Sequence, residues 1–374
     1  MDIKPPPKKI MKPTVPKPPV SALPPLEATP KQVATPKRSW WRFGVIGAGL
    51  FFLAATISTA IWYNWALTPV SDDTKQVRVV VRPGDTAAEI AQTLHDQDLI
   101  RSRLAFGLYT QLSGTRSQLQ AGGYVLSPNQ SVSSIVEHMV TGKTDEFNVT
   151  ILPGLTLNEL RKKFKADGFS DAEITAAFDA SYQHPLLATR PAGATLEGYI
   201  YPETYRMNAD QSLKSLFERV FDEMYKTLQD KKYLEEFAKR NLTIHQAVTL
   251  ASIVQKEVKN PVDQKQVAQV FLKRLADGMQ LGSDVTYMYA ADQMGVEATP
   301  ALESPYNTRK YTGLPPGPIA NMNPSALDAV AFPAPGEYVY FVAGDGPDEG
   351  KTFFALTFEE HEANIAAHCR ELCN

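Results

Sequence analysis

Residues 43–63 read FGVIGAGLFFLAATISTAIWY, a run of 21 residues without a formal charge. At a rise of about 1.5 Å per residue, a helix of this length crosses a hydrocarbon core of roughly 30 Å. Trp40 and Trp41 precede the run and Trp65 follows it, and such amphipathic rings prefer the two membrane interfaces. The stretch therefore predicts a membrane-spanning helix over residues 43–65, which divides the chain into a short N-terminal tail and a long C-terminal part.

The tail, residues 1–42, is rich in proline and carries nine Lys or Arg against Asp2 and Glu27. The whole chain of 374 residues has a net charge of −3, so the residues after the tail are acidic overall. With few large apolar side chains the tail cannot build a core, and we expect a disordered, polyproline-like spacer. The acidic remainder argues against a nucleic-acid-binding protein.

Basic residues beside the span set its orientation. Lys37, Arg38 and Arg42 place the tail in the cytoplasm and everything after the span on the far side of the membrane. A cleaved signal peptide would begin close to the N-terminus and end in small residues, whereas a long tail precedes this span and aromatic residues follow it. We therefore expect a retained, single-pass anchor. The tail is either a solvated topology signal or a docking segment for a cytoplasmic partner.

Beyond the span, residues 66–76 form a short polar linker and residues 77–150 predict a small α+β module. One pattern occurs three times from residue 77 onward: a β-branched run, a proline turn, a hydroxyl N-cap and an amphipathic helix. The N-cap residues are Thr86, Ser131 and Thr156, and each is followed four positions later by an apolar residue. The first two repeats fit within the module.

The turn Pro83-Gly84-Asp85-Thr86, placed between a strand and a helix, resembles that of the LysM glycan-binding modules. The resemblance implies a βααβ unit that holds chains containing N-acetylglucosamine in a shallow groove. The same four residues also form a generic turn followed by a helix cap. Both readings, glycan binding and local structure, stay open.

Residues 151–374 predict a larger mixed α+β domain, because helices and strands follow one another in irregular order rather than in a βαβ repeat. We expect helices at residues 213–228, 233–240, 243–259 and 262–277, a strand at 338–344, and a closing helix that begins near Thr357. The predicted fold class is thus α+β, with one N-terminal membrane helix, a LysM-like module and a catalytic domain.

The chain has only two cysteines, Cys369 and Cys373, so the core must rest on packing rather than on disulfides. They either remain free thiols or pair with each other if the end of the last helix frays. His368 lies beside them, but no fourth ligand for a metal ion is evident.

The most informative helix is residues 243–259, TIHQAVTLASIVQKEVK. At 100° per residue, Glu257 falls on the same stripe as Leu250, Ile253 and Val254. A carboxylate on an apolar stripe is costly unless it is paired or protonated with a raised pKa, and the second state suits a general acid. A structural alternative is that Glu257 ends the stripe and reaches a lysine.

Four segments carry a close resemblance to one family: LEGYIYPETY (196–205), LASIVQKEV (250–258), LGSDVTYMYA (281–290) and SPYNTRKYTGLPPGPIANMNPSALDAV (304–330). Together, and in this order, they resemble the YceG/MltG-like endolytic murein transglycosylases. Two positions depart from the usual pattern. Gln255 replaces the first acid of a common Glu-Lys-Glu, and Val285 replaces a common proline.

The resemblance implies a lytic transglycosylase that acts on peptidoglycan strands without a metal or organic cofactor. Glu257 would protonate the glycosidic oxygen between N-acetylmuramic acid and N-acetylglucosamine, and the muramic C6 hydroxyl would attack C1 to give a 1,6-anhydro end. Cleavage within nascent strands would then limit their length, with the penicillin-binding synthases as functional neighbours in the inner membrane.

Other polar and aromatic residues in the matching segments are candidates for substrate binding, although turn formation and packing explain them equally well. They are Glu197, Tyr201, Glu203, Ser283, Asp284, Tyr306, Asn307 and Thr308. Two other functions stay open: a glycan-binding scaffold without activity, and a hydrolytic muramidase. A muramidase needs a second acid near Glu257, for which Glu197 and Asp284 are the candidates.

Overall fold

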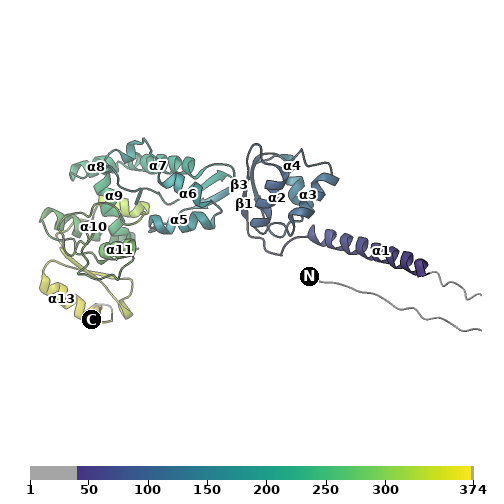
Figure 1. Cartoon of the computed structure of the whole chain (residues 1–374). Helices are drawn as coiled ribbons and strands as arrows, with labels where there is room; N and C mark the ends of the chain where they lie inside the picture. Colours follow the sequence, from purple (N-terminus) through teal and green to yellow (C-terminus); the bar gives the residue numbers. More distant parts are fainter. Residues whose placement is uncertain (1–39, 372–374) are drawn as a thin grey trace, which may run out of the picture. The chain divides into compact units, whose positions relative to one another are not determined.

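The computed structural model describes residues 40–371 (Figure 1). Residues 1–39 of the predicted disordered tail (residues 1–42) and the last three residues, 372–374, lie outside the described residues. Helix α1 runs from Trp40 to Ala66, and its segment Phe43–Ala66 is long and apolar enough to cross a membrane. The side chains of this segment are almost all exposed, so the predicted span is one continuous helix with an apolar surface.

Three two-stranded antiparallel sheets and twelve α-helices after α1 make up the rest of the described chain, which is therefore mixed α+β as expected. The first part of this region has the order strand, helix, helix, strand, helix. Its elements are β1 (Val77–Val81), α2 (Ala87–Asp96), α3 (Arg103–Leu112), β2 (Gly122–Leu126) and α4 (Val132–Thr141).

These elements enclose a small core of their own. Strand β1 pairs with β2 with Val79 opposite Tyr124, and both side chains are buried together with Ile90 and Ile135 from the helices. The predicted N-caps are confirmed: the side chains of Thr86 and Ser131 accept hydrogen bonds from the third backbone N–H of α2 and α4. This region is called the small module below.

The first half of the predicted linker, residues 66–76, is attached to the small module. The Val132 N–H donates to the carbonyl of Leu67 (3.1 Å), and the Val70 N–H donates to the carbonyl of Pro128 (2.9 Å). Leu67 also packs against the apolar core of the module. Thr68 and residues 71–76 are exposed, but the contacts of Leu67 and Val70 join the end of α1 to the module more closely than an extended linker would allow.

A second, larger core begins at Val149 and extends to Ala331. Strand β3, the third repeat of the sequence pattern, pairs with β4 and not with the sheet of the small module. The elements are β3 (Glu146–Thr150), α5 (Leu157–Ala166), α6 (Asp171–Phe178), the short 3₁₀ turn η1 (Pro185–Leu187), β4 (Thr204–Asn208), α7 (Leu213–Asp230), α8 (Tyr233–Lys239), α9 (Ile244–Glu257), α10 (Pro261–Ala276), α11 (Asp284–Met294) and α12 (Pro324–Ala331).

The chain ends in a hairpin and a helix: β5 (Tyr340–Ala343), the 3₁₀ turn η2 (Gly346–Asp348), β6 (Thr352–Ala355) and α13 (Phe358–His368). Figure 1 shows α13 lying along this hairpin. Phe341 of β5 packs edge-on against Phe271 of α10 (centroids 5.6 Å apart), which joins the hairpin to the larger core. Cys369, directly after α13, is disulfide-bonded and is therefore not a free thiol, whereas Cys373, its predicted partner, lies outside the described residues.

Candidate active site

Helix α9 places the predicted catalytic residue at its C-terminal end. Thr243 and Gln246 form a capping box at its start, as the sequence predicts. The helix was expected to continue to Lys259, but it ends at Glu257, and Val258 is extended. Asn260 and Pro261 explain the earlier end, because they start helix α10 as its N-cap and first residue, and a proline disfavours helical backbone before it. Glu257 thus lies at a helix terminus beside a sharp change in chain direction.

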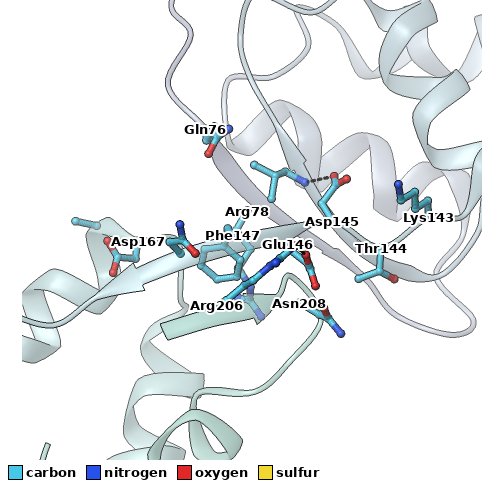
Figure 2. Close-up of a pocket in the computed structure, with 13 residues that line it drawn as sticks. Gln76, Arg78, Lys143, Thr144, Asp145, Glu146, Phe147, Asp167, Arg206 and Asn208 are labelled. Carbon is cyan, nitrogen blue, oxygen red and sulfur yellow. Dashed lines mark hydrogen bonds and ion pairs between the residues drawn. The ribbon is translucent and has the colours of Figure 1, made fainter. Parts of the chain in front are cut away.

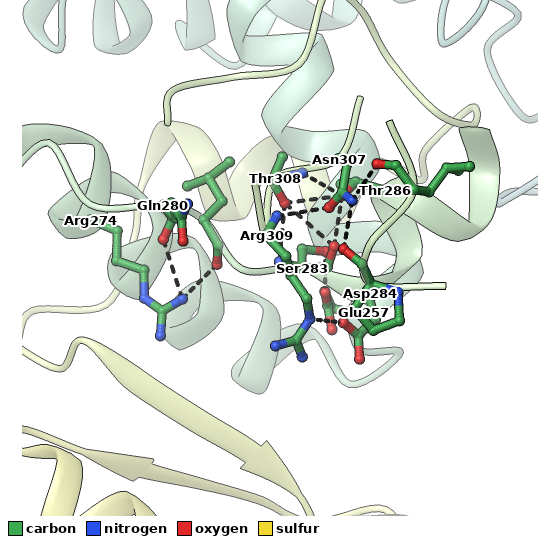
Figure 3. A network of polar contacts seen from close by, with 12 residues as sticks. Glu257, Arg274, Gln280, Ser283, Asp284, Thr286, Asn307, Thr308 and Arg309 are labelled. Carbon is green, nitrogen blue, oxygen red and sulfur yellow. Dashed lines mark hydrogen bonds and ion pairs between the residues drawn. The ribbon is translucent and has the colours of Figure 1, made fainter. Parts of the chain in front are cut away.

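Ser283 holds the carboxyl group of Glu257. Its hydroxyl donates a short hydrogen bond to Oε1 of Glu257 (Figure 3). Ser283 itself is buried and Glu257 is half-buried, so this hydrogen bond is partly shielded from solvent. With Oε1 occupied as an acceptor, Oε2 is the oxygen that remains for a proton and for contact with a substrate.

The position of Ser283 makes this contact unusual. Ser283 is the N-cap residue of α11, where a serine side chain normally accepts a hydrogen bond from the helix backbone, but it makes no such bond. The hydroxyl is turned toward Glu257 instead. The serine side chain thus departs from the usual N-cap contact and bonds to another helix instead, and such departures are typical of functional sites.

A pair of buried threonines fixes the backbone around Ser283. The hydroxyl of Thr308 accepts from the N–H of Ser283 (3.1 Å), and the N–H of Gly282 donates to the carbonyl of Thr308 (3.0 Å). The hydroxyl of Thr286 donates to the carbonyl of Ser283 (2.6 Å) and lies 3.0 Å from the Thr308 hydroxyl. The two loops are therefore bound to each other, and the direction of the Ser283 side chain is set by their pairing.

The environment of Glu257 favours its protonated form. Burial, the largest influence, raises the pKa of the Glu257 carboxyl to about 7, and the negative charge of Asp284 acts in the same direction. The hydrogen bond from Ser283 and the positive charges of Arg309 and Arg274 oppose this rise in the pKa. A carboxylic acid with a pKa near neutrality can donate its proton and later take one back, which general acid–base catalysis requires.

Glu257 lies in a groove with a volume of about 670 Å³. Arg274 closes one side: its guanidinium donates to the carbonyls of Val339 (2.6 Å) and Leu281 (2.6 Å) and lies over the ring of Tyr340. It thereby ties the hairpin to the loop that leads to Ser283. The groove is lined by residues of α9, α10, α11 and α13, of β5 and of the loops before α11 and around Arg309. The hairpin and α13 thus supply the second wall of the groove.

Of the eight residues predicted to bind substrate, three surround Glu257. Ser283 contacts it, Thr308 braces Ser283, and Asp284 forms an ion pair with Arg309 at the edge of the groove. Arg309 was not among the residues predicted from the sequence, although it directly follows the Tyr-Asn-Thr segment. Arg274 was not predicted either, because an arginine in the last turn of a helix normally interacts with the negative end of the helix dipole.

Asn307 and Tyr306, from the same segment, make contacts that stabilise the surrounding chain. Asn307 is fully buried, and its amide donates to the carbonyls of Pro300 and Leu302 (2.9 Å each), which shapes the loop from inside. The ring of Tyr306 packs against that of Tyr289, with centroids 5.1 Å apart. Neither side chain is among the described residues that line the groove around Glu257.

The three candidates from the segment 196–205 also lie outside the described lining of this groove. Glu197 is buried and accepts hydrogen bonds from the N–H of Leu157 (3.1 Å and 3.2 Å) and from the hydroxyl of Tyr289 (3.2 Å). Tyr201 is part of the apolar core. Glu203 is exposed and accepts a hydrogen bond from the N–H of Thr204, its own neighbour.

A larger cavity of about 1090 Å³ lies next to β1 and β3 (Figure 2), but most of its charged groups are already paired. Arg78 forms an ion pair with Glu173 (3.0 Å), and Arg206 forms one with Glu146. Asp145 accepts from the N–H of Val125 (2.7 Å). Since these groups stabilise the surrounding chain, the smaller groove with Glu257 is the better candidate for chemistry.

Comparison with known proteins shows which family this chain belongs to. The model of the YceG-like family matches residues 79–367. The chain belongs to the YceG-like family. This match includes α9, the Ser283 loop, the Arg309 loop and nearly all of α13, so every element that forms the groove lies within the part shared by the YceG-like proteins.

Similar proteins include two that are named endolytic murein transglycosylase. The one from Bacillus subtilis (strain 168) is 30% identical over 314 residues, which cover 79% of this chain and 86% of the relative. The one from Streptococcus pneumoniae (strain D39) is 29% identical over 343 residues, which cover 83% of this chain but only 61% of the relative. The pneumococcal protein is thus considerably longer than the region it shares with this chain.

A solved structure supports the fold of this YceG-like chain. The crystal structure of a putative YceG-like protein from Listeria monocytogenes matches with a TM-score of 0.52 and 29% sequence identity. The match covers 78% of this chain and 99% of the other. Among residues 40–371, no group of three or more His, Cys, Asp or Glu side chains is arranged to hold a metal ion.

The two departures from the family pattern have simple structural consequences. Val285 is the second residue of α11, a position where a proline is tolerated without loss of a helix hydrogen bond, so the exchange leaves the helix start intact. Gln255 accepts a hydrogen bond from the N–H of Asn323 (3.0 Å), the N-cap of α12. Gln255, which stands where the family usually has the first acid, therefore makes a structural contact and does not line the groove.

Proposed function

We propose that this protein is an endolytic lytic transglycosylase that cleaves the β-1,4 bond between N-acetylmuramic acid and N-acetylglucosamine within peptidoglycan strands. The observation that carries the proposal is the carboxyl group of Glu257, whose pKa is raised to about 7 in a groove and which is oriented by Ser283. The two curated relatives named endolytic murein transglycosylase support the same reaction class.

The reaction needs one carboxyl group in two successive states. Protonated Glu257 gives its proton to the glycosidic oxygen as the bond from that oxygen to C1 of the muramic acid breaks. The C6 hydroxyl of the same sugar then forms a bond to C1, and its proton passes to the Glu257 carboxylate. The products are a 1,6-anhydromuramic end and a free 4-hydroxyl, and the enzyme regains its starting proton.

The surroundings of Glu257 favour this reaction over hydrolysis. A hydrolytic muramidase needs a second carboxylate as nucleophile or as base for water. Asp284 is in an ion pair with Arg309, and Glu197 is held by the backbone of Leu157 and by Tyr289. A lytic reaction has no use for a second carboxylate because its nucleophile belongs to the substrate.

We further propose that α1 anchors the protein in the inner membrane with its N-terminus in the cytoplasm. The apolar exposed surface of α1 supports the anchor, and the basic residues before it support this orientation. The catalytic groove would then meet strands close to the membrane, where cleavage would end their elongation. The synthases that make these strands would be its functional neighbours.

Glycan binding by the small module is part of the same proposal. The first four elements of the module follow the order strand, helix, helix, strand, and the two strands pair in one sheet. This arrangement supports a LysM-like unit. In the turn Pro83–Thr86, however, the side chain of Asp85 accepts from the N–H of Arg82, and Thr86 is paired with Glu89. A glycan would therefore be recognised there mainly through the backbone of the turn.

The proposal is tested by digesting purified peptidoglycan strands with the full chain and weighing the new ends by mass spectrometry. We expect anhydromuramic ends, which are lighter by one water than the reducing ends left by a hydrolase. The Glu257→Gln variant serves as the matched inactive control. Reducing ends would instead establish a muramidase, and intact strands would leave a glycan-binding scaffold without activity.

A further inference from the structure

Helix α3 of the small module exposes a face of leucines. Its inner side is buried through Ala105 and Phe106. On the other side, Leu104, Leu108 and Leu112 are 64%, 38% and 77% exposed. They are spaced four residues apart, so they form one stripe along the helix. A continuous apolar stripe on the surface of a small module indicates a face that something else covers.

The chain around this leucine face is basic. Residues 101–120 contain Arg101, Arg103 and Arg116 and have no Asp or Glu, whereas the chain after the N-terminal tail is acidic overall. Arginines beside an apolar helical stripe are the pattern of helices that lie in the interface of an anionic membrane. A protein partner would have to match the same combination of leucines and positive charge.

The leucine face begins next to the end of the predicted membrane span. The guanidinium of Arg101 donates to the carbonyl of Pro69 (3.0 Å and 2.6 Å) and lies 4.8 Å from the centre of the Trp65 ring. The Val132 N–H donates to the carbonyl of Leu67. Trp65 belongs to the last turn of α1, so the start of α3 is bound to the level where a membrane interface is expected.

We propose that α3 lies on the surface of the membrane in which α1 is anchored, with Leu104, Leu108 and Leu112 inserted at the boundary of headgroups and acyl chains. The occupant of the leucine face is thus a bilayer that contains anionic phospholipid. A helix of ten residues is about 15 Å long, so the whole stripe can remain at the depth fixed by its attachment to Trp65. This inference rests on the proposed membrane anchor but not on the proposed reaction.

The consequence is a second attachment of the module to the membrane. With α1 alone, only the contacts of the module with Trp65, Leu67 and Pro69 would limit its tilt about the end of the span. An inserted leucine stripe adds buried apolar area at a second point and thereby limits this tilt. The module, and the glycan it would bind, is then presented at a defined height above the bilayer.

The test measures lipid contact at single positions of the full chain in nanodiscs of phosphatidylethanolamine and phosphatidylglycerol. An environment-sensitive fluorophore is attached to Leu104→Cys or Leu112→Cys in a background with Cys369→Ser and Cys373→Ser. Ala88→Cys, exposed on α2, is the matched control outside the stripe, and Ile57→Cys reports on α1. Lipids that carry a spin label at the top of the acyl chain serve as the quencher.

We expect blue-shifted emission at the two stripe positions and at least about twofold stronger quenching than at Ala88→Cys. Equal emission and quenching at stripe and control positions would overturn the proposal, because the face would then be in water. A blue shift without quenching by lipid would also overturn it and would indicate a second copy of the chain or another protein.

Two further controls separate this proposal from the others. Quenching at Ile57→Cys but not at the stripe would refute the surface contact alone, whereas loss of quenching at both places would refute the anchor as well. The same measurement on a Glu257→Gln background should be unchanged, since lipid contact does not depend on cleavage. The triple variant Leu104→Ser, Leu108→Ser, Leu112→Ser should still cleave soluble strands.

Discussion

Glu257, which is half-buried, and Glu197, which is buried, have the same altered acidity and different surroundings. Burial raises the pKa of each carboxyl to about 7. Glu257 accepts one side-chain hydrogen bond, from Ser283, and lines a groove. Glu197 accepts from the backbone at the start of α5 and from Tyr289, and it is 3% exposed. The comparison shows that a raised pKa does not identify a catalytic acid unless one carboxyl oxygen can reach a substrate.

The strongest test of this comparison exchanges each glutamate for glutamine. Glu257→Gln removes the transferable proton and keeps the size of the side chain, so we expect the rate of strand cleavage to fall about 10²–10⁴-fold. Glu197→Gln should keep most of the activity, because its oxygen can still accept from Leu157. Initial rates on purified strands measure both, and circular dichroism confirms folding. Comparable losses in the two variants would contradict the assignment of roles.

A second test concerns the pH dependence of stability. Because the folded pKa of Glu197 lies above the value of 4.5 expected in the unfolded chain, the folded state holds the proton more tightly. The resulting stabilisation is fully present below pH 4.5 and is lost as the pH rises through about 7. It amounts to about 3 kcal/mol at most, and Glu197→Gln should abolish it. Urea unfolding at pH 5 and pH 8 measures the difference, and an unchanged pH dependence in the variant would refute the protonated state of Glu197.

The third test uses the two neighbours of Glu257 that act on its acidity in opposite directions. Ser283 stabilises the carboxylate, so Ser283→Ala should raise the pKa of Glu257 further and move the loss of activity to higher pH. Asp284→Asn should lower that pKa and move the loss to lower pH. Removing the charged hydrogen bond should also slow cleavage about tenfold in Ser283→Ala. Shifts in the same direction for both variants in a pH–rate profile would be inconsistent with this electrostatic picture.

The smallest expected effect is at Glu203, the third acid among the candidates. Its side chain is exposed and, within residues 40–371, accepts a hydrogen bond from the adjacent N–H of Thr204. Glu203→Gln should change the free energy of unfolding by no more than about 0.5 kcal/mol and leave cleavage rates unaltered. A clear loss of activity would show that the segment 196–205 contacts substrate after all.

Several features could be predicted from the sequence because they depend on neighbouring residues. The charge-free run 43–63 predicts a single apolar helix, and the caps at Thr86, Ser131, Thr156 and Thr243 follow from residues within one turn. The position of Glu257 on an apolar stripe also follows from helical periodicity alone. In each case the physical cause acts over a few residues of one segment.

Tertiary structure decided which polar residues meet. Ser283 looks like an N-cap in the sequence, and only the approach of its loop to α9 turns its hydroxyl toward Glu257. Asn307 lies in the same matching segment as Thr308, yet it braces its own loop from inside. Periodicity gives the buried side of a helix, but a partner 26 residues away depends on how separate loops pack together. The sequence by itself therefore predicted the candidate acid, whereas the packing of α9, α11 and the Arg309 loop determined what orients it.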